Sequence, residues 1–315
     1  MLTTQSKPVL IRHRRSKLGR KDNIAYVTML LPVVILLFLF NYLPMGGLVM
    51  AFQRFVPAKG LFSPDQKWVG LRQFQMAFAD PLFPQALSNT LYLSITKMVL
   101  HMVCAIGMSI LMNELRSSVH RRTVQTLVYI PHFISWVILG SVMRTMFASD
   151  GIVNQVLLSM GMKEPVGFLT DPENFSVLLI ISDVWKEFGF GTIIYMASIS
   201  GIDPGLYEAA RIDGANKPQQ IWHVTIPGIM HIIVILSLLN IGGVLNSAFD
   251  QIINLYSPNV YRTADVLDTL IYRKGIVSTN YSLATAIGLF KGVISLVLTS
   301  VSYLLAWKLA DYKIF

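Results

Sequence analysis

Residues 201–227 read Gly-Ile-Asp-Pro-Gly-Leu-Tyr-Glu-Ala-Ala-Arg-Ile-Asp-Gly-Ala-Asn-Lys-Pro-Gln-Gln-Ile-Trp-His-Val-Thr-Ile-Pro, a polar segment between two long apolar ones. Asp203 can accept hydrogen bonds from the first free amides of a helix, and Pro204 suits the first helical position. Gly214 tolerates the left-handed conformation in which many helices end. This part of the segment therefore predicts one short helix that begins after Asp203 and ends near Gly214.

The rest of the segment predicts a second short helix. Asn216 is a favourable capping residue, and Pro218 lies within the first turn that follows it. Pro227 is expected to end this helix before the next apolar run, because proline lacks the amide hydrogen that a helix interior needs. Two short helices joined by a turn are therefore expected between the apolar segments.

The first of these helices has features that suit contact with another protein. Ala209 and Ala210 are expected to keep one side of the helix thin, so that a partner can approach its backbone closely. Glu208 and Arg211 offer charges to such a partner. The same three letters, Glu-Ala-Ala, are also good helix composition and alone would indicate nothing more.

The composition indicates a membrane protein. Apolar residues make up 53% of the 315 residues and charged residues only 14%, against about a quarter charged in soluble proteins. The mean hydropathy is +0.55. The net charge is +9, and seven of the basic residues precede residue 24. A basic tail beside an apolar segment is typical of membrane topology and contact with anionic lipid. Nucleic acid is not an expected partner.

Six apolar segments are long enough to cross a bilayer as helices, for which about 20 residues suffice. They lie near residues 24–52, 88–112, 123–147, 176–200, 227–249 and 283–307. None alternates with the two-residue period of a barrel, and lipid offers backbone groups no partners, so helices are required. The first segment is too long for a signal peptide and lacks a small-x-small cleavage site.

These segments predict an all-α polytopic membrane protein with six transmembrane helices. Residues 1–23 are expected to form a basic cytoplasmic tail, and residues 24–315 a single transmembrane domain. Basic residues favour the cytoplasmic side. With the N-terminus inside, this side receives 14 Lys and Arg residues and the outer loops receive 8. Both termini and the segment 201–227 are therefore expected in the cytoplasm.

Three groups of residues in segment 201–227 have the spacing of a known motif: Glu208-Ala209-Ala210, Gly214, and Val224-Thr225-Ile226-Pro227. This pattern resembles the Glu-Ala-Ala loop of the permeases of binding-protein-dependent ABC importers. At two positions where the family pattern has isoleucine and leucine, this sequence has Val224 and Ile226. Further stretches resemble the carbohydrate-uptake branch of this family. They are residues 68–74, 89–91, 185–195, 212–215 and 281–290.

The resemblance implies a type I importer permease in a bacterial cytoplasmic (inner) membrane, which translocates a sugar or oligosaccharide by alternating access. It implies that the loop couples the chain to an ATPase through Glu208, Ala209, Ala210, Arg211, Asp213, Gly214, Ile226 and Pro227. The implied partners are a second homologous permease, expected to be a different chain, an ATPase dimer and an extracytoplasmic solute-binding protein. The outer loops near residues 53–87, 148–175 and 250–282 would form the rim on which the binding protein docks.

Charged residues within apolar segments are costly and should face protein or water. The candidates for a solute cavity are Lys97, His101, Asp183, Trp185, Lys186, Glu187 and Lys291. Asp183, Lys186 and Glu187 share one helical face, which indicates either a polar cavity wall or a self-neutralising pair whose lysine extends toward water. Four aromatic residues could stack on sugar rings, namely Trp185, Tyr195, Tyr92 and Trp136, although aromatic residues in membrane helices more often serve packing or the interfacial belt.

The other three candidates, Lys97, His101 and Lys291, add no matching acids, so a shared cavity is expected to be net basic. Such a cavity would favour an anionic or hydroxyl-rich solute, for example a fragment of a uronic-acid polymer such as alginate.

The sequence also lacks several motifs. It contains no Gly-x-x-x-x-Gly-Lys-Ser/Thr loop, so the chain is not expected to bind ATP and Mg²⁺, which the partner ATPase would hold. It has no metal-ligand pattern or nucleophile elbow, and its single cysteine, Cys104, lies in an apolar segment. We therefore expect no cofactor, no metal and no enzymatic activity. An ion-coupled secondary transporter remains the alternative, with a membrane-embedded enzyme a distant third.

Overall fold

The computed structural model describes residues 20–115, 117–246 and 249–310. Most of the predicted basic tail, residues 1–19, lies outside the described residues, and so does Lys313 near the other end. The chain divides into two compact units, residues 1–49 and 50–315. Each unit is described by itself.

The first unit contains a long apolar helix. It consists of α1 (Arg20–Leu37), a π-helical turn (Phe38–Tyr42), α2 (Leu43–Met45) and the start of a 3-10 helix (Gly46–Phe52). Pro32 lies inside α1 and does not interrupt the helix. The π-helical turn, in which the Leu43 amide donates to the Phe38 carbonyl, comes directly before Pro44. Such wider turns relieve the clash of a proline ring with the preceding turn.

The second unit is helical apart from one small antiparallel sheet, in which β1 (Gln53–Arg54) pairs with β2 (Lys67–Trp68). Its outer and central helices are α3 (Arg72–Ala79), α4 (Leu82–Glu114), α5 (Ser118–Tyr129), α6 (Trp136–Met146), α7 (Ile152–Ser159) and α8 (Pro172–Ser200). The remaining helices are α9 (Pro204–Ile212), α10 (Lys217–Gln220), α11 (Ile226–Ile241), α12 (Phe249–Leu255), α13 (Tyr261–Ala264), α14 (Leu267–Tyr272) and α15 (Tyr281–Ala310).

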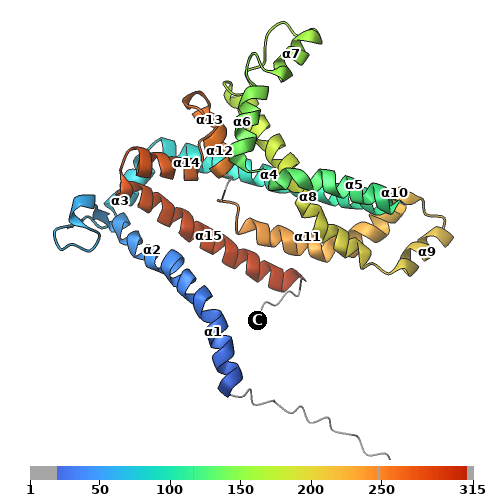
Figure 1. Cartoon of the computed structure of the whole chain (residues 1–315), viewed down its shortest axis with the longest axis horizontal. Coiled ribbons are helices and arrows are strands. Elements are labelled where there is room, and N and C mark those ends of the chain that lie inside the picture. The colour runs from blue at the N-terminus through green and yellow to red at the C-terminus, as the bar shows by residue number, and fades with distance from the viewer. Residues whose placement is uncertain (1–19, 116, 247–248, 311–315) are drawn as a thin grey trace, which may run out of the picture. The chain divides into compact units, whose positions relative to one another are not determined.

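The long helices α4 and α8 lie side by side (Figure 1). Helix α9 lies at the opposite end of the unit from α3 and α14 (Figure 1). Leu93, Phe175 and Leu179 are fully buried in the core between α4 and α8. The close approach of α5 to α8 depends on Gly189, because a Cβ atom there would lie 2.1 Å from the Val128 carbonyl oxygen. The helices α4 and α8 therefore share an apolar core, and α5 packs closely against α8.

Among the described residues, four helices are long and apolar enough to cross a membrane. A fifth span results if one bent pair of helices is counted as a single span. The four are Tyr26–Phe52, Leu82–Glu114, Lys217–Ile241 and Tyr281–Lys308. The segment near 123–147 does not form one straight helix, because Ser118–Phe133 and Trp136–Met146 meet at 96°. Pro131 lies before this bend, and the Ser135 hydroxyl accepts from the Ile138 amide to begin a new helix.

The segment near 176–200 forms α8, whose 29 residues give a length of about 44 Å at roughly 1.5 Å per residue. This length suffices for a span. However, α8 carries the charged residues Asp183, Lys186 and Glu187 near its middle, so it is not one of the four apolar helices. The predicted number of six transmembrane helices is therefore not confirmed by length and composition, which give four to five.

Candidate functional site

The first helix of the polar segment is built as predicted. An Asp203 carboxylate oxygen accepts from the Gly205 amide at 2.9 Å, and α9 starts at Pro204. Gly214 adopts φ +82°, and the next amide, of Ala215, donates to the Ala210 carbonyl at 2.9 Å. These local contacts cap both ends of α9.

The second helix begins as predicted and continues further. The Asn216 and Gln219 side chains each bond to the other's backbone amide, at 3.0 and 2.8 Å, and form a capping box. The prediction that Pro227 ends this helix is wrong. A π-helical turn (Ile221–Thr225) precedes the proline, with the Ile226 amide donating to the Ile221 carbonyl. This wider turn accommodates the proline ring.

Because the helix does not stop, α10, the π-helical turn and α11 form one continuous apolar helix, Lys217–Ile241. A second contact joins α9 to this helix. The Tyr207 hydroxyl lies 3.0 Å from the hydroxyl of Thr225, which is buried. The polar segment is therefore anchored to the beginning of a membrane-spanning helix rather than separated from it.

The exposed face of α9 carries Glu208, Ala209 and Ile212, whose exposed fraction is 87%. Ala210 is half-buried on the inner side of the helix. Neighbouring positions on a helix point about 100° apart, so only one of the two alanines can lie on the outer side. This residue is Ala209. Of the other predicted coupling residues, Arg211, Asp213, Gly214 and Pro227 are exposed and Ile226 is half-buried.

A cavity of about 610 Å³ lies between α4, α8 and α11. Four of the predicted cavity residues line it: Lys97, His101, Asp183 and Glu187. The aromatic side chains of Trp136 and Tyr195 also line it, as do polar groups that the sequence analysis missed, namely Ser94, Asn240 and Asn246. The signal for the asparagines was available, since an amide within an apolar segment needs a polar partner or water.

The other three predicted residues, Trp185, Lys186 and Lys291, are not part of the cavity wall. Trp185 is half-exposed, and Lys186 is buried beside the cavity. Lys291 of α15 binds Asp268 of α14, with 2.5 Å between the ammonium nitrogen and the carboxylate oxygen.

One buried network of charges joins α4 to α8. The Lys97 ammonium lies 3.6 Å from Asp183, and it donates to the Gln251 side-chain oxygen at 2.5 Å. His101 lies 3.4 Å from the other oxygen of Asp183. Lys97 and Asp183 are only 5% and 6% exposed. Gln251 in turn donates to Ser182 at 2.9 Å, so α12 takes part in the same network.

A second network lies one turn further along α8. Lys186 donates to Glu187 at 2.6 Å and to the His132 carbonyl at 3.0 Å. The other oxygen of Glu187 lies 2.6 Å from the His132 ring nitrogen. The Lys186 ammonium also lies 5.5 Å from the centre of the Trp136 ring, within the range of a cation–π contact.

These pairs correct the expected charge of the cavity. The prediction that Lys97, His101 and Lys291 lack matching acids is wrong, because Asp183 faces the first two and Asp268 binds the third. The fixed charges of the cavity wall are therefore balanced by ion pairs between helices rather than net basic. The cavity presents hydrogen-bond donors and acceptors together with aromatic rings.

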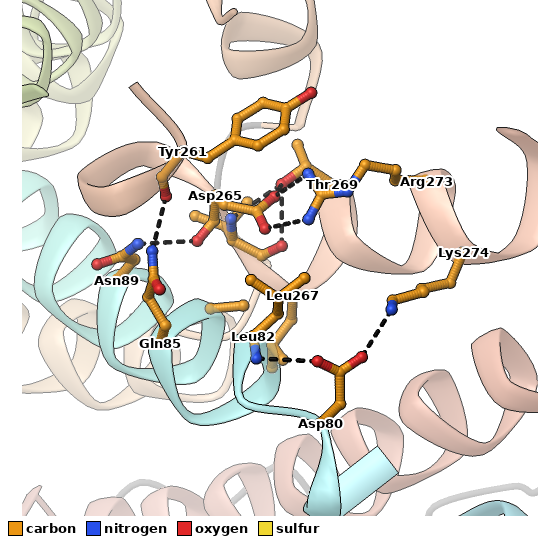
Figure 2. A network of polar contacts seen from close by, with 12 residues as sticks. Asp80, Leu82, Gln85, Asn89, Tyr261, Asp265, Leu267, Thr269, Arg273 and Lys274 are labelled. Carbon is orange, nitrogen blue, oxygen red and sulfur yellow. Dashed lines mark hydrogen bonds and ion pairs between the residues drawn. The ribbon is translucent and has the colours of Figure 1, made fainter. Parts of the chain in front are cut away.

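A third polar network lies at the other end of α4 and holds the segment 261–274 in place (Figure 2). Asp265 accepts two hydrogen bonds from Arg273, at 3.0 and 2.5 Å. Gln85 donates to the Tyr261 carbonyl at 3.0 Å, and Asn89 donates to the Asp265 carbonyl at 3.0 Å. Two side chains of α4 thus bind the backbone of this segment, so the segment is fastened to the start of α4.

Asp80 and Lys274 form an ion pair beside this network, 2.6 Å apart (Figure 2). Burial opposes ionisation of the Asp80 carboxyl, but hydrogen bonds from Lys274 and the Leu82 amide favour it. Together with the charges of Lys274 and Arg273, these bonds hold the pKa of Asp80 below its ordinary value. The pair therefore joins the start of α4 to the turn before α15.

Comparison with known families gives a match over most of the chain. Residues 101–310 match the model of the family described as "Binding-protein-dependent transport system inner membrane component". The chain is 38% identical to the polygalacturonan/rhamnogalacturonan transport system permease protein YteP of Bacillus subtilis, with 91% of this chain and 89% of that protein covered. It is 35% identical to protein LplB of the same organism, with 89% and 87% covered.

Two solved structures share the fold over nearly the whole chain. One is a bacterial ABC transporter involved in the import of the acidic polysaccharide alginate, with a TM-score of 0.83, 39% identity, and 92% of this chain and 96% of that chain covered. The other is a bacterial alginate ABC transporter in complex with an alginate pentasaccharide-bound periplasmic protein. Its TM-score is 0.82 at 38% identity, with 93% and 97% covered.

Proposed function

The chain belongs to the family of binding-protein-dependent transport system inner membrane components, the permeases of ABC importers, and we propose that it carries an acidic oligosaccharide across the bacterial inner membrane at the expense of ATP. It is an integral membrane protein with the type I importer permease fold. Family membership supports this proposal over an ion-coupled secondary transporter and over a membrane-embedded enzyme.

The observation that carries the proposal is a continuous link from the cytoplasmic segment to the cavity. Tyr207 of α9 contacts Thr225, and the helix that contains Thr225 runs unbroken to Ile241. Leu236, Leu239 and Asn240 on the far part of this helix line the cavity. Force applied to α9 by an ATPase would therefore reach the cavity wall through one helix.

We propose that the importer contains this chain, a second and different permease, an ATPase dimer that holds ATP and Mg²⁺, and a solute-binding protein. The ATPase would bind the segment 201–227 through Glu208, Ala209, Ala210, Arg211, Asp213, Gly214, Ile226 and Pro227. The binding protein would dock on the outer loops, one of which is fastened to α4 by the network in Figure 2. Closure of the ATPase dimer would then switch the cavity between inward-open and outward-open states.

The proposal of an acidic solute is supported by the relatives and by the donors in the cavity. A permease for polygalacturonan and structures of alginate importers align over about nine-tenths of the chain. Because the fixed charges are balanced, an anionic sugar would be held by specific donors rather than by a net positive field. We propose that the sugar carboxylate competes with Asp183 for Lys97 and His101, while Trp136 and Tyr195 stack on the sugar rings. Glu187 would form part of the wall, and Lys186 would hold Glu187 in place.

The test is transport by the reconstituted complex of both permeases, the ATPase and the binding protein in proteoliposomes. A panel of acidic and neutral oligosaccharides of equal length is compared, with ATP hydrolysis and internalised sugar as readouts. We expect acidic oligosaccharides to stimulate ATP hydrolysis. They should accumulate inside the proteoliposomes only when ATP is present on the side of the membrane where the ATPase lies. Equal transport of the neutral series would overturn the solute class, and uptake driven by an ion gradient without ATP would overturn the mechanism.

A further inference from the structure

The cytoplasmic segment contains a notch of about 340 Å³, separate from the solute cavity. Its lining residues are Ala210, Asp213, Gly214, Ala215, Gln219, His223 and Val224. We propose that this notch receives one basic side chain, arginine or lysine, from the ATPase subunit, with Asp213 as its counter-ion. This inference rests on the proposed function, since it takes the partner of α9 to be the ATPase.

Three small residues, Ala210, Gly214 and Ala215, form part of the lining of the notch. Gly214 has φ +82°, and no atom lies within 4 Å of the position that a Cβ atom would occupy there. Ala210 and Ala215 add only methyl groups. A residue with a long side chain at any of these positions would fill the space, so the sequence leaves room for an inserted side chain.

Three features make the notch suited to a cation. The carboxylate of Asp213 is exposed and makes no hydrogen bond or ion pair within the described residues. The C-terminus of the nine-residue α9 adds partial negative charge, because its peptide dipoles align. The Nδ1 atom of His223 lies 2.9 Å from the Gln219 carbonyl and donates to it, so a ring with a single proton presents Nε2 as an acceptor.

The neighbouring basic residues do not occupy the notch. Lys217 binds Glu114 of α4, with 2.6 Å between nitrogen and oxygen, and neither Lys217 nor Arg211 belongs to the lining. The negative charge at Asp213 is therefore open to a partner. A partner cation would complete the ion pair that the chain itself does not supply.

The surface beside the notch favours a protein over a free ion. Ile212 is 87% exposed and Leu206 is 54% exposed, although both lie on the polar segment. Exposed apolar side chains next to an unpaired charge are typical of a protein interface, in which the apolar contacts exclude water around the ion pair. Asp213 alone offers too few ligands for a metal, and no metal-like cluster occurs within the described residues.

The test is the affinity of the detergent-purified permease pair for its ATPase, measured against salt concentration. Asp213→Asn keeps the shape of the notch and removes its charge, and we expect an affinity weaker by about 30-fold or more, as for a desolvated pair that loses one partner. We also expect it to lose part of the salt dependence, which a merely structural role would not change. Ala210→Met fills the notch and should weaken binding at all salt concentrations. Asp65→Asn, on an exposed outer turn, is the matched control and should bind as the unaltered chain does.

The outcomes separate the two proposals. Failure of the unaltered permease pair to bind the ATPase would overturn the proposed function itself. Normal binding by the unaltered pair, Asp213→Asn and Ala210→Met would overturn the notch alone and leave the function standing. If Asp213→Asn does not fold, Asp213→Glu is measured instead, because it keeps the charge. The notch is supported if Asp213→Glu keeps the salt dependence of the unaltered chain while Ala210→Met weakens binding at all salt concentrations. It is overturned if Ala210→Met binds as Asp213→Glu does.

Discussion

The Lys97 ammonium lies 3.6 Å from the Asp183 carboxylate, and both side chains are more than nine-tenths buried between α4 and α8. Both residues line the cavity between α4, α8 and α11. Breaking a buried pair is costly because one charge remains without compensation.

Asp183→Asn is expected to destabilise the permease by about 3 kcal/mol, since Lys97 keeps its charge in a buried site. The measurement is thermal unfolding of the purified complex in detergent. The double variant Lys97→Met with Asp183→Leu should lose less, because it leaves no unpaired charge. The expectation is wrong if the single variant is as stable as Asp150→Asn, an exposed carboxylate that serves as the control.

Tyr207→Phe removes the hydroxyl that joins α9 to Thr225 and keeps the ring. We expect solute-stimulated ATP hydrolysis to fall several-fold while the ATPase still binds, since the exposed face of α9 is unchanged. Thr225→Val should have the same effect. The double variant should be no worse than either single variant, because both remove one contact. Additive losses would show that the two hydroxyls act separately.

Gly189→Ala is expected to destabilise the bundle by about 1 to 3 kcal/mol, as overpacked sites do. The new Cβ atom would lie 2.1 Å from the Val128 carbonyl oxygen and force α5 away from α8. Gly107→Ala in α4 is the matched control, because nothing lies within 4 Å of its Cβ position. The control should be neutral or stabilising by up to about 1 kcal/mol. Thermal unfolding of both variants checks the difference.

The lowered pKa of Asp80 predicts how the outer network responds to acid. A carboxyl whose pKa is lowered on folding stabilises the fold above its unfolded value, here 3.8. This stabilisation is lost as the pH falls through the lower, folded value. Asp80→Asn should therefore be less stable than the unaltered chain at neutral pH, and the difference should begin to shrink below pH 3.8 and disappear only below the lower, folded value.

Thermal unfolding between neutral pH and pH 3 tests this prediction. Lys274→Met, which removes the main partner of Asp80, should give the same pattern. A difference between Asp80→Asn and the unaltered chain that persists unchanged into acid would contradict the role assigned to the ion pair.

Much of the polar segment 201–227 could be predicted because its structure is local. The capping of α9 by Asp203, the capping box at Asn216 and the turn at Gly214 depend on residues within a few positions of one another. This pattern could not predict whether the helix ends at Pro227 or continues through it. A π-helical turn and the end of a helix satisfy the same proline, and the packing of Thr225 against Tyr207 favours the first.

By itself, the sequence determined that the chain is a helical membrane protein, where its polar segment lies and which charges fall within apolar segments. These properties follow from composition and from neighbours along the chain. Only the tertiary structure decided that Lys97 meets Asp183, that Lys291 meets Asp268 instead of the cavity, and that the chain bends by 96° after Pro131. The physical reason is that pairing between helices depends on their rotation and depth, which residues far apart in sequence set together.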